Sequence, residues 1–244
     1  MALSFDRLLK PPARIEIGGV PEGHDARLVA QIAALAEGGV LHVARDDARL
    51  AVLAQALGFF APDVTIYQVP AWDCLPYDRV SPNAEIVSRR MDALADLALN
   101  PPGKNTVILT TVAAVLQRVP TRELLRSSAF IVRARDQLDE KALLDFLTRH
   151  GFQRAGTVME PGDFAVRGGL IDVYPPGAEE PYRIDLFGDQ VERLRRFDPL
   201  TQRSTGEAQE LRLVPMSEAP LEPETIARFR QGYRHHFGAV TDND

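Results

Sequence analysis

The sequence has 244 residues, 45% of them hydrophobic and 25% charged, which is enough chain for two folded domains, and no apolar run approaches the roughly 20 residues of a membrane span. A net charge of −6 argues against tight, sequence-independent binding of nucleic acid, because such binding depends on lysine and arginine side chains that neutralise phosphates. One cysteine and five histidines without ligand spacing argue against a disulfide framework and a metal site, and we expect a cytoplasmic protein with no membrane partner.

The first half alternates short β-branched runs with helical stretches, as in parallel strands joined by crossover helices. The pattern predicts strands at residues 14–17, 40–43, 64–68 and 106–110. It predicts helices at residues 25–36, from 46 or 47 to 57, and from 81 or 83 to 100. A proline-rich loop, PAWDCLPYDRVSPN, precedes the last of these helices. The first half therefore reads as an α/β domain with a parallel sheet.

Residues 18–25, GGVPEGHD, lie between the first predicted strand and the first predicted helix, where a nucleotide-binding phosphate loop would sit. Gly18 and Gly23 have the spacing of G-x-x-x-x-G-K-[ST], but His24 and Asp25 replace the lysine and the hydroxyl. A largely neutral histidine does not replace a lysine at phosphates, and a carboxylate opposes the positive potential of a helix amino-terminus. Two glycines are a weak signal, and an ordinary turn is the alternative. In both cases we expect no ATP hydrolysis here.

The pattern changes near Pro120, and we place a domain boundary at about Ser127. After a helix at residues 140–150, the alternation predicts strands at residues 163–167, 169–174, 181–187 and 190–197. In the turn at residues 187–190, Gly188 suits the positive φ of a type II′ hairpin. The second domain is therefore predicted to be α+β with antiparallel strands. A further segment begins at about Leu213 and contains a helix at residues 224–235.

Two stretches of this sequence resemble the bacterial transcription-repair coupling factors (Mfd). They are residues 70–90, PAWDCLPYDRVSPNAEIVSRR, and residues 160–204, which include GDFAVRGGLIDVYP and YRIDLFGDQVERLRRFDPLTQRS. The second stretch also resembles the excision-repair protein UvrB, and in both families this domain contacts UvrA. UvrB has an intact phosphate loop and an aromatic-rich β-hairpin that clamps damaged DNA. Here the corresponding region is shorter, and its aromatic residues are Trp72 and Tyr77.

The resemblance implies a degenerate P-loop-NTPase-like domain 1a at residues 1–126, a UvrA-binding domain 2 at residues 127–213, and the start of domain 1b at residues 214–244. It implies a module that recruits UvrA and links stalled RNA polymerase to nucleotide excision repair, without catalysis of its own. Longer family members are ATP-dependent DNA translocases, and their RNA polymerase, duplex DNA, ATP and magnesium sites lie in parts that this sequence does not encode. No cofactor is therefore expected here. The alternative is a UvrB-like NTPase or DNA-damage-binding motor fragment.

Alternation along residues 182–187 predicts a core face and an outward face, and the outward face carries Arg183, Asp185 and Phe187. The same reasoning points Arg167 outward. The pattern alone leaves open that Phe187 packs under the hairpin turn and that the arginines are solvated surface charges. The resemblance assigns Arg167, Arg183 and Phe187 to the contact with UvrA, with Asp185 as a weaker candidate.

Other conspicuous residues have simpler interpretations. Trp72 and Tyr77 are expected to anchor a loop to the sheet, since no basic stripe accompanies them as it would in a single-strand binder. The arginines at residues 193, 195 and 196 are bracketed by acidic residues and read as a charged hairpin edge.

Overall fold

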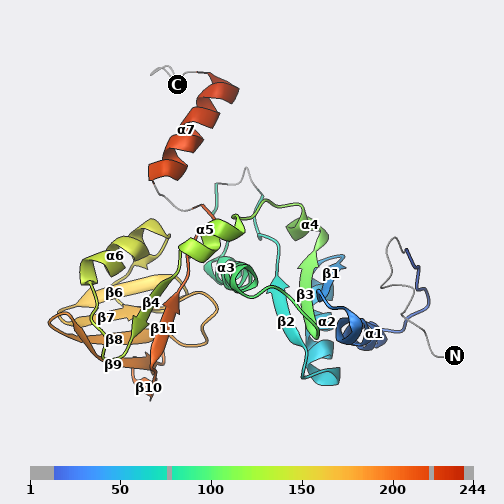
Figure 1. The fold of residues 1–244 in the computed structure, drawn as a ribbon, viewed down its shortest axis with the longest axis horizontal. Coiled ribbons are helices and arrows are strands. Elements are labelled where there is room, and N and C mark those ends of the chain that lie inside the picture. The colour runs from blue at the N-terminus through green and yellow to red at the C-terminus, as the bar shows by residue number, and fades with distance from the viewer. Residues whose placement is uncertain (1–13, 76–78, 220–222, 239–244) are drawn as a thin grey trace. The chain divides into compact units, whose positions relative to one another are not determined.

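The computed structural model describes residues 14–75, 79–219 and 223–238. They form two compact units that divide between Val119 and Pro120 (Figure 1). The short helix α5, Arg122–Ser127, belongs to the second unit, whereas the sequence interpretation placed the boundary at the end of this segment. None of the helices in the described ranges is long and apolar enough to cross a bilayer.

Unit 1 contains a three-stranded parallel sheet in the order β1-β3-β2. The strands are β1, Val40–Ala44; β2, Thr65–Val69; and β3, Thr106–Thr111. The helices are α1, His24–Leu35; α2, Asp47–Phe60; α3, Ala84–Leu99; and the short α4, Val112–Val115. Both neighbours of β3 run parallel to it, because helices carry the chain back between successive strands. The predicted α/β architecture with a parallel sheet is confirmed.

The core of unit 1 lies between the sheet and the helices α1 and α2. Apolar residues at helical spacing meet alternate residues of the strands, and the buried set is Ala26, Val29, Ala33, Ala44, Leu50, Leu53, Leu57, Val107 and Leu109. Side-chain caps set where the next helices begin. The Asp46 carboxylate accepts from the Arg49 amide at 2.8 Å before α2, and the Asn83 amide oxygen accepts from the Glu85 amide at 2.8 Å before α3.

The strand predicted at residues 14–17 is wrong: these residues form no strand in the structure. A strand requires a neighbour to which its backbone groups can bond, and no strand of the described residues pairs with this segment. Residues 18–23 therefore approach α1 from irregular chain and not from a sheet.

Unit 2 contains a six-stranded sheet in the order β10-β9-β8-β7-β6-β5 and a two-stranded sheet of β11 and β4. Its strands are β4, Phe130–Arg133; β5, Gln153–Arg154; β6, Asp163–Arg167; β7, Leu170–Val173; β8, Tyr182–Phe187; β9, Gln190–Phe197; β10, Ser204–Glu207; and β11, Glu210–Leu213. Its other helices are α6, Glu140–Arg149, and α7, Pro223–Phe237. All neighbouring strands are antiparallel except β5 and β6, so the predicted antiparallel second domain is confirmed.

One face of the six-stranded sheet is buried over the middle of strands β6 to β9. It carries Phe164, Ile171, Ile184 and Leu194, each no more than 4% exposed, and the amphipathic helix α6 lies beside these strands (Figure 1). Leu143 and Leu147 are the buried residues of α6. The opposite face carries the alternate residues of each strand, including the residues that the sequence predicts to bind a partner.

Candidate functional site

The segment with the spacing of a phosphate loop contains an ion-pair cluster. Gly23 precedes α1 with a φ of 83°, and the Asp25 carboxylate accepts from the Ala26 amide at 3.0 Å. The Arg49 guanidinium, from α2, donates to the Asp25 carboxylate and, at 3.0 Å, to the Glu22 carboxylate. His24 is exposed at the first position of α1. Two carboxylates at the start of α1 therefore bond the same arginine of α2.

This cluster also influences His42 in β1. Burial lowers the pKa of the His42 imidazole, the Asp25 carboxylate opposes this effect, and the Arg49 guanidinium adds to it. The arrangement thus holds charges of both signs at the start of α1. Gly18, the first residue of the segment, is not packed against other residues, because no atom lies within 4 Å of a Cβ added there. In the part of the chain that the structure describes, no three His, Cys, Asp or Glu side chains are placed so that they could hold a metal ion together.

The outward face of the six-stranded sheet brings together the residues predicted to bind UvrA. Arg167 in β6 lies opposite Leu170 in β7, Leu170 lies opposite Asp185 in β8, and Asp185 lies opposite Arg193 in β9. Phe187 follows Asp185 on the same face of β8. We call the surface made by Arg167, Leu170, Asp185, Phe187 and Arg193 the docking face.

Phe187 is the most exposed apolar side chain of the docking face, with 79% of its surface accessible. It ends β8 just before the hairpin turn, where Gly188 has a φ of 64°, as predicted. The alternative that Phe187 packs under the turn is wrong. Arg167 is also exposed, and its guanidinium donates to the Gly156 carbonyl and, at 3.3 Å, to the Thr157 hydroxyl.

Arg183 differs from the prediction, because its side chain is only 15% exposed. Its Nε and Nη2 atoms donate to the two carboxylate oxygens of Asp172 at 2.7 and 2.8 Å, and its guanidinium lies 4.6 Å from the centre of the Phe197 ring. The hydrogen bond to Asp172, itself 3% exposed, raises the pKa of Arg183. The expectation of a freely solvated Arg183 is wrong, since Asp172 lies directly opposite it on β7.

Asp185, the weaker candidate, is also bonded within the sheet. Its carboxylate oxygens accept from Nη2 of Arg195 at 2.9 and 2.6 Å, and Nη1 of Arg195 donates to the Ser204 hydroxyl at 3.0 Å. Sequence reasoning missed the contributions of Asp172 and Arg195. The alternation of Leu170, Ile171 and Asp172 was the available signal, because it puts Asp172 on the outward face.

A second hairpin holds the two sides of the docking face close together. Arg167 and Leu170 are joined by Gly168 and Gly169, and the Gly169 carbonyl accepts from the Leu186 amide at 2.7 Å. A Cβ atom at Gly169 would lie 2.8 Å from the Leu186 carbonyl oxygen. The absence of a side chain at Gly169 thus lets β8 approach the turn, next to Phe187.

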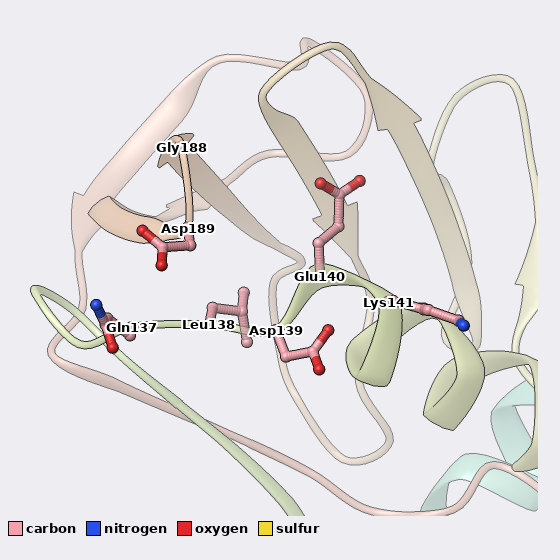
Figure 2. A pocket seen from close by; sticks show the side chains of 7 residues that line it. All are labelled: Gln137, Leu138, Asp139, Glu140, Lys141, Gly188 and Asp189. Carbon is pink, nitrogen blue, oxygen red and sulfur yellow. The ribbon is translucent and has the colours of Figure 1, made fainter.

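A hollow of about 550 Å³ lies beside the turn that follows Phe187. Figure 2 shows Asp189 from the turn and Asp139 and Glu140 from the start of α6 around it. The remaining lining residues are Gln137, Leu138, Lys141 and Gly188. Three carboxylates and one ammonium group make a poor site for an anionic nucleotide, because phosphates are bound by amides and cations.

The aromatic residues of the proline-rich loop are only partly described. The Arg90 guanidinium lies 5.8 Å from the centre of the Trp72 ring, and its Nη1 donates to the Pro70 carbonyl. Trp72 is thus held by Arg90 of α3, whereas the prediction was that it anchors the loop to the sheet. Tyr77 lies outside the described residues.

Comparison of the sequence with known proteins finds one matching family model and relatives that share one name. The family described as "UvrB interaction domain" matches residues 131–218. Proteins named transcription-repair-coupling factor are 34% identical over 217 residues in Escherichia coli, 37% over 208 in Rickettsia prowazekii and 32% over 237 in Myxococcus xanthus. These matches cover 89%, 84% and 93% of this chain, but 19%, 18% and 19% of those proteins. The chain thus spans about a fifth of the length of these relatives.

Proposed function

Because this chain is related to the transcription-repair-coupling factors over most of its length, we propose that it is the UvrA-recruiting part of such a factor. In this role it links stalled RNA polymerase to nucleotide excision repair. The observation that supports the proposal best is the exposed Phe187 on the docking face, within the stretch that matches the UvrB interaction domain. A large exposed aromatic side chain beside arginine is the combination that dominates binding energy at protein interfaces.

The proposal assigns no catalysis and no cofactor to this chain. Asp25 and Glu22 at the start of α1 already bond Arg49, and the lysine and hydroxyl of a working phosphate loop are replaced by His24 and Asp25. The ATP, magnesium, RNA polymerase and duplex DNA sites belong, in this proposal, to other parts of a longer factor. A cytoplasmic location belongs to it as well, because such a factor acts where the bacterial chromosome is transcribed.

Calorimetric titration of purified UvrA with the chain tests the proposal. Truncating a hot-spot side chain typically costs about 2 kcal/mol or more, so Phe187→Ala should weaken binding roughly thirtyfold. Leu200→Ala is a matched control, because Leu200 is an apolar side chain of the same unit with 80% exposure, lies in the turn after β9, and is not one of the five residues of the docking face. Parent and L200A should bind alike. Absence of UvrA binding by the parent chain would overturn the proposal.

A further inference from the structure

The docking face carries an exposed cation at each end of one cross-strand row. Arg167 is exposed in β6, Arg193 is exposed in β9, and Leu170 and Asp185 lie between them in register. Directly opposed residues on neighbouring strands lie about 5 Å apart, so the row spans four strands side by side. Arg167 bonds only to uncharged oxygens among the described residues, and Arg193 has no hydrogen bond or ion pair there.

The carboxylates on the outward face of the neighbouring strands, Asp185 and Asp172, are already paired. Asp185 lies opposite Arg193, but both of its oxygens accept from Arg195 at 2.9 and 2.6 Å. Asp172 is bonded to Arg183 through both oxygens. Asp185 and Asp172 therefore neutralise Arg195 and Arg183, and neither forms an ion pair with Arg167 or Arg193.

We propose that Arg193 is a further contact residue of the docking face and pairs with a carboxylate on the surface of UvrA. This inference rests on the proposed function and adds a residue to its site. Arg167 and Arg193 are cations on either side of the apolar Leu170 and Phe187, so the surface that they fit is an apolar patch flanked by acidic side chains. Guanidinium groups bind carboxylates through two parallel hydrogen bonds, which gives such a contact direction as well as strength.

A protein surface fits these observations better than nucleic acid. Binding to a phosphate backbone requires an extended set of cations, whereas the docking face offers two unpaired arginines about three strand spacings apart, on a chain with a net charge of −6.

The test compares Arg193→Glu with Arg196→Glu in UvrA titrations. Arg196 is exposed on the same strand but points to the opposite face of the sheet. Because both variants change the net charge by the same amount, a difference in UvrA affinity between them reports on the docking face. R193E should weaken UvrA binding at least tenfold and R196E less than twofold. The loss in R193E should shrink at high salt, because an exposed ion pair is screened. Both variants should melt within a few degrees of the parent, since neither side chain is buried.

The possible results separate this inference from the proposed function. If F187A loses UvrA and R193E binds like the parent, the inference is wrong and the proposed function stands. If the parent does not bind UvrA, the proposed function fails first. If the parent binds a short DNA duplex at physiological salt and R193E does not, Arg193 is a nucleic-acid contact and the inference is overturned. Equal loss in R193E and R196E would indicate a general charge effect and would also overturn it.

Discussion

Arg183 and Asp172 form a bidentate ion pair in which the carboxylate is 3% exposed. Replacing Arg183 by glutamate would bring two carboxylates together at a site with little access to water. Removing one partner of a buried pair costs about 3 kcal/mol or more, because the other charge is left unpaired. For this reason, loss of UvrA binding in R183E does not by itself identify a contact residue.

We therefore expect Arg183→Glu to lower the thermal unfolding midpoint by several degrees, as followed by circular dichroism. Arg193→Glu is the control, because it is the same substitution at an exposed residue of the same face. A midpoint of R183E equal to that of the parent would mean that the Asp172 pair contributes little to folding, and a binding defect in that variant would then be a direct one.

His42 gives unit 1 a dependence on pH. Its folded-state pKa lies below the usual value near 6.5, mainly because burial disfavours the charged imidazole. Unfolding exposes the imidazole to water, so His42 binds a proton more readily in the unfolded chain than in the folded one. The contribution of His42 to stability is thus complete above pH 6.5 and is lost as the pH falls through the folded-state pKa.

The free energy of unfolding of the parent should accordingly fall more between pH 7.5 and about pH 5.5 than that of His42→Gln. Urea titrations at both pH values measure the difference. The other four histidines are common to both proteins, so they cancel in the comparison. Equal pH dependence in the two proteins would show that His42 titrates as it does in the unfolded chain.

At the scale of elements, the two hairpins of the docking face depend on glycines for different reasons. Gly188 has a left-handed φ of 64°, which the sequence of the turn predicts. At position 169 only glycine fits beside the neighbouring strand, since a Cβ there would lie 2.8 Å from the Leu186 carbonyl oxygen. The Leu186 carbonyl belongs to the backbone and cannot rotate away as a flexible side chain could.

Gly169→Ala should destabilise unit 2 by about 1–3 kcal/mol, the usual cost of forcing extra atoms into a close contact. It should also weaken UvrA binding, because the strand that it displaces carries Phe187. Gly156→Ala is the control: Gly156 has no atom within 4 Å of an added Cβ and no positive φ. Urea unfolding of both variants checks this, and equal stability of G169A and G156A would contradict it.

Elements with strong local patterns were predicted well. Strands β6 and β9 begin and end where alternation placed them, and Asp46 and Asn83 cap α2 and α3 as the helix-start signals indicated. Strands β4 and β11 were missed. They pair with each other across some 77 residues of chain, through contacts such as Arg133 with Glu210, and short strands of this kind have no local signal.

The candidate site was predicted only in part, because its residues depend both on local alternation and on the pairing of distant strands. Alternation gives the face of a side chain, so Arg167, Arg183 and Phe187 were assigned to the outward side of the sheet. It does not give the register between strands, and only register brings Asp172 opposite Arg183. The assignment of these residues to UvrA comes from the family resemblance and stays a prediction until binding is measured.

At the scale of the whole molecule, the charge cluster at the start of α1 predicts that nucleotide does not stabilise the chain. A ligand present at a hundred times its dissociation constant adds about 2.7 kcal/mol to the stability of the state that binds it. Millimolar ATP with magnesium should leave the thermal midpoint unchanged relative to magnesium alone. A saturable rise of several degrees would favour the alternative of a UvrB-like NTPase fragment.

The parallel sheet of unit 1 has a consequence for the handling of this protein. Strand β1 is an edge strand: among the described residues it pairs with β3 alone, and its side chains Leu41 and Val43 are 57% and 41% exposed. An apolar edge with unpaired amide and carbonyl groups is a template on which another chain can add a strand. We expect self-association to begin at β1 when the isolated chain is concentrated, and light scattering of Val43→Lys against the parent should show less of it, because a lysine on an edge strand opposes such pairing.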